Sequence, residues 1–309
     1  MFCIRVPATT ANLGPGFDTL GLALELYNYL EVKVGGSSGL PTIIVRGEGQ
    51  EELPNNEQNL ILKALKRAFA HRALTPPELH CHLVNNIPIA RGLGSSAAAI
   101  VAGLLAAQEL LPVPLTQEEL LDLACELEGH PDNVSAALLG GLVISCRDSN
   151  GKSHFLKVHL PESLKVVVAI PDFQISTQEA RRVLPNSLTH HDAVFNVGRT
   201  ALLTASLLTG DLSALTLALQ DRLHQPYRSA LIPGMEEVFK AARDAGALGV
   251  ALSGAGPSII AFAQDDLEAI GKAMEQAFRI KGISARVVIT MPTLNGAEVL
   301  PQLQLSSAS

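Results

Sequence analysis

The segment at residues 88–98 combines glycine and serine in a pattern suited to binding phosphate. It consists of Pro88, Ile89, Ala90, Arg91, Gly92, Leu93, Gly94, Ser95, Ser96, Ala97 and Ala98. Gly92 and Gly94 allow a tight turn and a close approach to a ligand, and the two serines stand where an alanine-rich helix begins. Free N–H groups and the helix dipole favour an anion there. The segment predicts a phosphate site, with Ser96 as a candidate Mg²⁺ ligand.

Two better-known phosphate motifs do not describe this segment. The Walker A pattern, Gly-x-x-x-x-Gly-Lys-Ser/Thr, is absent. The pattern Gly-x-Gly-x-x-Gly, followed by an acidic residue about 20 positions later, is absent as well. Taken alone, GLGSS also has a plainer interpretation as a glycine turn with a serine helix cap.

Three further segments place polar side chains next to glycines. Residues 6–24, VPATTANLGPGFDTLGLAL, contain Asn12 and Asp18, and residues 128–134 read EGHPDNV. Residues 252–258, LSGAGPS, contain Gly254 and lie between two apolar stretches. The plainer interpretations are a turn at Asn12, a helix cap at Asp18 and a hairpin turn at 252–258.

The elements that position these motifs alternate between strand and helix without the regular spacing of a doubly wound sheet. Strands are predicted at 2–6, 28–34, 41–46, 78–86, 140–146, 164–170 and 285–290, with two more around a turn within 249–263. Helices are predicted at 59–71, 95–111, 116–127, 177–183, 193–208, 212–219, 234–245 and 267–279. Thr116 and Glu119 form a capping-box pattern at the start of the third helix.

A composition change at the turn 148–153 suggests a division of the chain. We expect two α+β domains, residues 1–155 and 156–309, and a frayed tail at 302–309. A glycine-rich turn is expected at 35–39. The many small residues suggest helices packed closely on sheets.

Composition and charge exclude several classes of protein. The 309 residues are 47% hydrophobic and 17% charged, with a net charge of −7. No run of five Lys or Arg offers the basic stripe that nucleic acid binding needs, and the longest apolar run, 97–107, is shorter than the span of about 20 residues that a membrane requires. The N-terminus has no apolar signal region. We expect a soluble, cytoplasmic protein that binds neither nucleic acid nor membrane.

The cysteines and one histidine pair were also considered as metal ligands. Cys3, Cys81, Cys125 and Cys146 have no zinc-like spacing and are expected to be lone buried thiols. His80 and His82 share one face of a predicted strand, where a solvated face is a better interpretation than a metal pair because no third ligand is evident.

The string at 88–98 resembles the phosphate loop of the GHMP kinases, P-x-x-x-G-L-G-S-S-A-A, at every fixed position. Residues 6–24 resemble the N-terminal motif of the homoserine kinases within that superfamily rather than those of galactokinases or mevalonate kinases. Residues 128–134, 176–181 (STQEAR) and 221–234 (DRLHQPYRSALIPG) resemble further homoserine kinase segments. Residues 252–258 resemble the superfamily's C-terminal loop, which closes over phosphates and substrate.

This resemblance implies a fold and a set of ligands. The fold would be a two-domain α+β GHMP kinase fold, with an N-terminal domain like domain two of a ribosomal protein, a ferredoxin-like C-terminal domain and ATP between them. The ligands would be ATP, Mg²⁺ and L-homoserine. Asn59 and Leu60 lie near the position where the family binds the base, and a homodimer is possible.

The resemblance also assigns roles to individual residues. Ser96 and Glu128 match the magnesium ligands, with Glu126 as the alternative to Glu128. Asn133 stands where other GHMP kinases have a catalytic Asp, so Ser96, Glu128 and Asn133 form the catalytic set. The implied substrate-binding residues are Asn12, Asp18, His130, Asn133, Thr177, Arg181, Arg228 and Gly254.

These residue types suit the implied substrate. Arginine binds a carboxylate through two parallel N–H donors, and Asp18 with Asn12 suits an ammonium group. No strong general base is evident, because Asp132 is expected to point elsewhere if it lies on a helix. We assign His130 to the substrate pocket and favour direct phosphoryl transfer. The rival functions are phosphorylation of another alcohol, such as mevalonate, and ligand sensing without catalysis.

Overall fold

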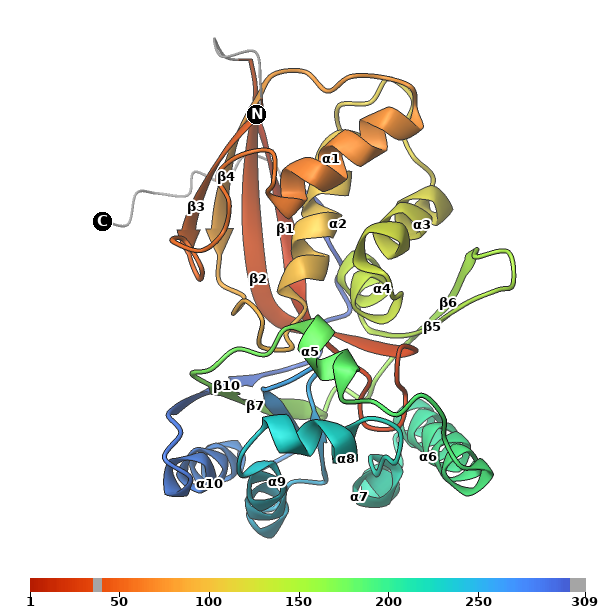
Figure 1. Cartoon of the computed structure of the whole chain (residues 1–309), viewed down its shortest axis with the longest axis vertical. Coiled ribbons are helices and arrows are strands. Elements are labelled where there is room, and N and C mark those ends of the chain that lie inside the picture. The colour runs from red at the N-terminus through yellow and green to blue at the C-terminus, as the bar shows by residue number, and fades with distance from the viewer. Residues whose placement is uncertain (36–40, 301–309) are drawn as a thin grey trace.

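The computed structural model describes residues 1–35 and 41–300 of the chain. The predicted tail at 302–309 and most of the predicted turn at 35–39 lie outside these residues. Two sheets organise the described part, and Figure 1 shows the first above the second. The molecule therefore has the α+β character expected from the sequence.

Seven strands of the described residues form the first sheet, in the order β11-β1-β2-β4-β3, with β5 paired to β2 and β6 to β5. They are β1 (Phe2–Ala11), β2 (Leu20–Val34), β3 (Thr42–Gly47), β4 (Leu79–Asn85), β5 (Leu142–Arg147), β6 (Ser153–Val158) and β11 (Glu298–Leu300). Within this sheet β3 and β4 run parallel, and the other pairs are antiparallel. Since β11 pairs with β1, the end of the described chain returns to the first sheet.

Four helices cover one side of the first sheet (Figure 1). They are α1 (Leu60–His71), α2 (Ser95–Gln108), α3 (Gln117–Glu128) and α4 (Asp132–Leu139). Helix α2 is buried nearly all round, as its run of alanine and leucine predicts. Helix α3 begins at the predicted capping box, where Thr116 and Glu119 each bind the other's backbone N–H.

Glycine sets how closely α1 and α2 approach. A Cβ on Gly103 of α2 would overlap the carbonyl oxygen of Ile61 in α1. We expect Gly103→Ala to lower the free energy of unfolding by about 1–3 kcal/mol, because the helices must move apart. In α6 (His190–Thr209), Gly198→Ala should instead raise it by about 0.5–1 kcal/mol, since a Cβ there meets open space. Denaturant unfolding of both variants tests this, and changes of the same sign would contradict it.

The second sheet has the strand order β10-β7-β9-β8, with every neighbouring pair antiparallel. Its strands are β7 (Lys165–Pro171), β8 (Gly249–Leu252), β9 (Ile259–Ala263) and β10 (Ala285–Thr290). Helices α9 (Met235–Asp244) and α10 (Leu267–Ile280) pack below it in Figure 1. Numbered within the sheet, this order is 4-1-3-2, the ferredoxin-like arrangement.

Strands β7, β8 and β9 of the second sheet are buried on both faces, whereas the edge strand β10 is partly exposed. Side chains alternate between the two faces along each strand. Val166 and Val168 of β7 join the core shared with the first sheet, whereas Val167 and Ala169 join the core against α9 and α10. Helix α6 and three short helices lie between β7 and α9 in the chain. The short helices are α5 (Thr177–Arg182), α7 (Leu215–Ala218) and α8 (Gln225–Arg228).

Several predicted elements have different extents in the structure. Strands β1 and β2 continue well past residues 2–6 and 28–34, and α4, α8, β6 and β11 were not predicted. The turn at 148–153 joins β5 to β6 within the first sheet. The proposed division into residues 1–155 and 156–309 stays a prediction.

The remaining expectations concern histidine, cysteine and membrane-spanning segments. His80 and His82 share the more exposed face of β4, as predicted, and lie beside Thr42 and Glu31 respectively. The expectation for cysteine is wrong at Cys146, which is exposed, while the other three are buried. Within residues 1–35 and 41–300, we find no helix that is long and apolar enough to cross a bilayer.

Candidate active site

A cavity of about 500 Å³ lies between the segments that carry the predicted motifs. Its wall includes the 88–96 turn, residues from both ends of the 128–133 segment, and Arg181, Arg228 and Gly254 from the second half of the chain. The fold therefore brings together residues that are far apart in the sequence.

The phosphate loop turns from the end of β4 into the N-terminus of α2. Gly92 and Gly94 have φ values of 73° and 70°. Gly94 is the N-cap and supplies no side-chain acceptor, so the first N–H groups of α2 are left for a ligand. Ala97 and Ala98 are buried in the core beneath the loop, whereas the residues from Pro88 to Ser96 line the cavity.

Both glycines of this loop also face other parts of the protein. A Cβ on Gly94 would overlap Thr9 Oγ1, and a Cβ on Gly92 would overlap the carbonyl oxygen of Ser253. Ser253 Oγ donates to the carbonyl of Gly92 over 2.6 Å. The 252–258 segment is a hairpin turn between β8 and β9, and this contact places it directly on the phosphate loop.

Arg91 acts as a tether rather than as a free cation. Its guanidinium donates to the carbonyl oxygens of Ile89, Pro171 and Asp172, at 3.0, 2.9 and 2.6 Å. Ile175 N also donates to the carbonyl of Ala90. These bonds connect the phosphate loop to the chain that follows β7.

Ser96 and Glu128 place two oxygen ligands side by side. Ser96 Oγ donates to Glu128 Oε1 over 2.6 Å, and burial raises the pKa of Glu128 despite this bond. Glu126, the alternative, instead accepts two hydrogen bonds from Arg67 at 2.9 and 2.7 Å on the exposed side of α3. The geometry therefore selects Glu128 as the candidate metal ligand.

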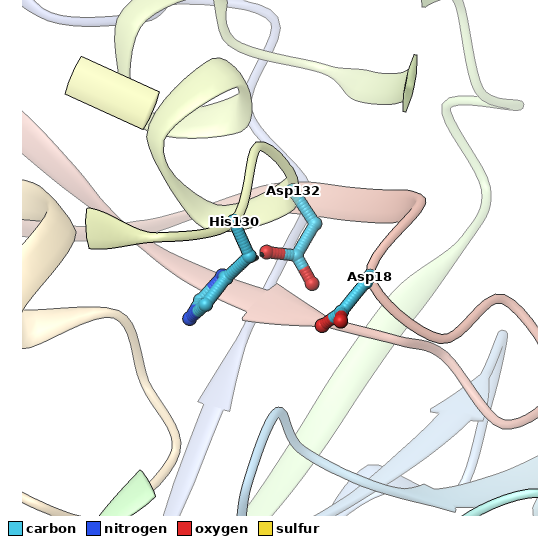
Figure 2. Close-up of side chains that lie close together, drawn as sticks. All are labelled: Asp18, His130 and Asp132. Atoms are coloured by element: carbon cyan, nitrogen blue, oxygen red, sulfur yellow. Dashed lines mark hydrogen bonds and ion pairs between the residues drawn. The ribbon is translucent and has the colours of Figure 1, made fainter. Parts of the chain in front are cut away.

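Asp18, His130 and Asp132 all line the cavity, and Figure 2 shows that their side chains lie close together. One ligand atom from each lies within 4.8 Å of the others. Asp132 is 1% exposed, and its Oδ1 accepts from His130 Nδ1 over 2.6 Å. Burial lowers the pKa of His130, but the hydrogen bond and charge of Asp132 outweigh it, so the pKa is raised.

The expectation that Asp132 points away from the site is wrong. Asp132 and Asn133 are the first two residues of α4, where side chains lean back toward the helix N-terminus. Both therefore reach the cavity wall. Asn133 Oδ1 accepts from Thr9 Oγ1 over 2.8 Å, which places Asn133 between the phosphate loop and Asp132.

The predicted ammonium and carboxylate sites contact one another. Arg181 donates to both oxygens of Asp18, at 3.0 and 2.7 Å. Asn12 Oδ1 accepts from Asp18 N, and its Nδ2 donates to the carbonyl of Gly254. Asn12 therefore positions the Asp18 turn against the 252–258 segment.

Arg228 is buried with only part of its guanidinium free. Nε donates to Ala180 O at 3.1 Å, and Nη1 contacts Gly254 O at 3.0 Å and His224 Nδ1 at 3.2 Å. Within the described residues Nη2 has no hydrogen-bond partner. Because Nε and Nη1 are occupied, the expected two-atom fork from Arg228 to a carboxylate is not available, and only the N–H groups of Nη2 remain for a ligand.

The charge of Arg228 has no carboxylate within ion-pair distance among the described residues. It is 2% exposed, and burial followed by the charge of Arg181 lowers its pKa to about 10. The centroid of the Phe17 ring lies 5.3 Å from the guanidinium carbon of Arg181 and also 5.3 Å from that of Arg228. A buried cation without an anion is costly, so this end of the cavity suits an anionic group.

Comparison with known proteins gives the same assignment along nearly the whole chain. Residues 59–141 match the family model "GHMP kinases N terminal domain", and 203–280 match "GHMP kinases C terminal". The homoserine kinases of Moorella thermoacetica and Carboxydothermus hydrogenoformans are each 48% identical, covering 96% of this chain and 99% and 96% of their own. The chain belongs to the homoserine kinases of the GHMP kinase family.

A solved structure supports the fold of this kinase. The crystal structure of homoserine kinase from Cytophaga hutchinsonii superposes with a TM-score of 0.87 at 33% identity, and 97% of each chain is covered. The two-domain GHMP kinase fold predicted from the motifs is therefore confirmed, together with the family's use of ATP.

Some residues next to the kinase site had no predicted role. Phe17, Asp221 and His224 lie inside the motifs at 6–24 and 221–234, and they contact Arg228 or one another rather than lining the cavity. Asn59 caps α1, while Leu60 is 40% exposed, and both line the cavity beside Leu53 and Pro54. Thr177, at the start of α5, lines the cavity as well.

Proposed function

We propose that the protein transfers the γ-phosphoryl group of ATP to the hydroxyl of L-homoserine, giving O-phospho-L-homoserine and ADP in threonine biosynthesis. The observation that carries this proposal is the charge pattern of one cavity. An anion-binding loop lies at one end, and both a carboxylate cluster and a buried, unpaired arginine lie at the other.

The charged end of the cavity fits an α-amino acid. The ammonium group would lie among Asp18 and Asp132, and the carboxylate would meet Nη2 of Arg228 beside Arg181. In the free protein Asp18 and Arg181 pair with each other. When a zwitterion binds there, its ammonium group can replace Arg181 as the partner of Asp18. Its carboxylate can replace Asp18 as the partner of Arg181.

The other end of the cavity fits the phosphates of ATP with Mg²⁺. The N–H groups after Gly94 would bind phosphate oxygens, and Ser96 with Glu128 would hold the metal, which prefers oxygen ligands and neutralises phosphate charge. The raised pKa of Glu128 supports this, since a buried carboxylate is stabilised by a nearby cation.

Asn133 would orient the acceptor hydroxyl between the two ends. Its side chain is held by Thr9 next to Gly94, so a hydroxyl beside it faces the phosphate loop. The neutral amide of Asn133 cannot accept the proton of the acceptor hydroxyl. We propose direct transfer of the phosphoryl group, in which a phosphate oxygen takes that proton.

His130→Ala tests whether a base is needed. We expect KM for L-homoserine to rise about tenfold, because the pocket loses a contact, while kcat changes little. A loss of more than about 4 kcal/mol in transition-state stabilisation, with unaltered substrate binding, would show that His130 is the base.

A panel of alcohols separates this function from its rivals. ADP release should be fastest with L-homoserine and slow with mevalonate, galactose, serine and threonine, because only homoserine combines both charges with a hydroxyl at this reach. No turnover with millimolar homoserine would disprove the assignment, and no ADP release with any alcohol would favour a ligand sensor. A cytoplasmic location and a homodimer stay predictions.

A further inference from the structure

His224 lies just before α8 and is fully buried, and the chemistry proposed above gives it no contact with substrate. Its Nε2 lies 2.7 Å from the carbonyl oxygen of Gly14, and its Nδ1 lies 3.2 Å from Nη1 of Arg228. Gly14 belongs to the turn between β1 and β2 that also carries Asp18. One imidazole therefore joins the ammonium-site turn to the carboxylate-site arginine.

The neighbours of His224 determine its protonation: besides Gly14 O and Arg228 Nη1, Asp221 Oδ2, which is also an acceptor, lies 3.5 Å from Nε2. A carbonyl oxygen only accepts, so Nε2 must carry a hydrogen, and a guanidinium only donates, so Nδ1 must offer its lone pair. Only the neutral imidazole protonated at Nε2 satisfies both. Burial lowers the pKa of His224 to about 4, against the charge of Asp221 and with that of Arg228.

The donors of Arg228 show what this contact achieves. A guanidinium has five N–H groups, of which Nε supplies one and each Nη supplies two. Ala180 O, Gly254 O and His224 Nδ1 occupy the N–H groups of Nε and Nη1. Without an acceptor at Nδ1, one buried N–H would lack a partner, and the guanidinium would rotate to find another.

We infer that His224 is a positioning residue for the acceptor substrate: by accepting from Nη1 of Arg228, it directs Nη2 toward the substrate carboxylate at a set distance from Asp18. This inference rests on the proposed binding of that carboxylate by Arg228. Since His224 touches no reacting atom, its effect falls on KM for L-homoserine rather than on kcat or KM for ATP.

Two amide substitutions separate the two contacts of His224. His224→Asn places its Oδ1 near the position of Nδ1 and keeps an acceptor for Arg228. His224→Gln places its amide near Nε2, which keeps the bond to Gly14 but removes that acceptor. We expect KM for L-homoserine to rise about tenfold or more in His224→Gln and less than about threefold in His224→Asn, with KM for ATP unchanged in both.

The exposed residue His159 supplies the matched control. His159→Asn and His159→Gln should leave both KM values unchanged. Equal effects of Asn and Gln at position 224, a larger effect of Asn, or a parallel rise in KM for ATP would overturn the inference, because each fits a purely structural role.

A measurement on the unaltered protein covers the case in which the variants do not fold. With ¹⁵N-labelled histidine, Nδ1 of His224 should show the shift of an unprotonated nitrogen that accepts a hydrogen bond at neutral pH. A protonated Nδ1 would overturn the inference.

Arg228→Met, assayed beside these variants, separates the two levels of the argument. If it leaves KM for L-homoserine unchanged, the proposed carboxylate contact is wrong. If it raises that KM while His224→Asn and His224→Gln behave alike, only the role of His224 is wrong.

Discussion

Glu128→Gln is expected to lower kcat by about 10²- to 10³-fold, or about 2.7–4 kcal/mol of activation free energy. The amide keeps the shape of the side chain but loses the charged oxygen that would bind Mg²⁺ beside Ser96, 2.6 Å away. Because Glu128 would act on the metal rather than on the acceptor, KM for L-homoserine should change by less than about twofold. Steady-state kinetics over a range of Mg²⁺ concentrations measure both quantities.

Although Glu128→Gln should lower kcat, it should not lower the stability of the folded protein. Glu128 is the last residue of α3, where the helix dipole disfavours a carboxylate. None of the residues in the last turn of α3 is basic. A raised pKa means that the charged form is destabilised in the folded protein above that pKa. The neutral variant should therefore melt no lower than the parent protein at neutral pH without metal.

Glu126→Gln is the matched control, since it removes a carboxylate from the same helix. Glu126 pairs with Arg67 outside the cavity, and kcat should be unaffected by its loss. Equal losses in the two variants, or full activity of Glu128→Gln at every Mg²⁺ concentration, would contradict the metal assignment.

Local sequence patterns were sufficient to predict those parts of the fold that are stabilised by contacts between residues close together in the sequence. The capping box at Thr116 and Glu119 fixed the start of α3, because both of its hydrogen bonds join residues three positions apart. The serine-rich start of α2 likewise revealed the phosphate loop. Strand β1 was underestimated because Thr9 and Thr10 are polar yet fully buried, and their partners lie far away in the sequence.

Long-range contacts account for what the sequence did not reveal in the site. From the sequence, Gly92 and Gly94 were interpreted as positions where a ligand can approach the backbone. They also allow Ser253 to pack against Gly92 and Thr9 to pack against Gly94, and no local sequence pattern predicts these contacts. Asp132 was misjudged because α4 was not predicted, so the start of that helix was unknown. The family resemblance indicated both arginines, but only the structure shows which donors of Arg228 remain.

Arg228→Met should raise KM for L-homoserine by about 10- to 150-fold, because a charge-assisted hydrogen bond contributes about 1.5–3 kcal/mol. KM for ATP should not follow, since the phosphate loop has its own contacts. Methionine fills much of the buried volume without a charge. Arg199→Met, at a side chain that stacks on Phe195 and contacts Gln220 away from the cavity, is the control and should leave KM unaltered.

A substrate analogue assigns this loss to the carboxylate. 2-Amino-1,4-butanediol keeps the ammonium group and the hydroxyl of homoserine but has an alcohol in place of the carboxylate. The parent protein should prefer homoserine over it by about the factor that Arg228→Met loses, and the variant should use the two compounds with nearly equal kcat/KM. If Arg228→Met kept the full preference for homoserine, the carboxylate would be bound elsewhere, and the buried charge of Arg228 would serve only the fold.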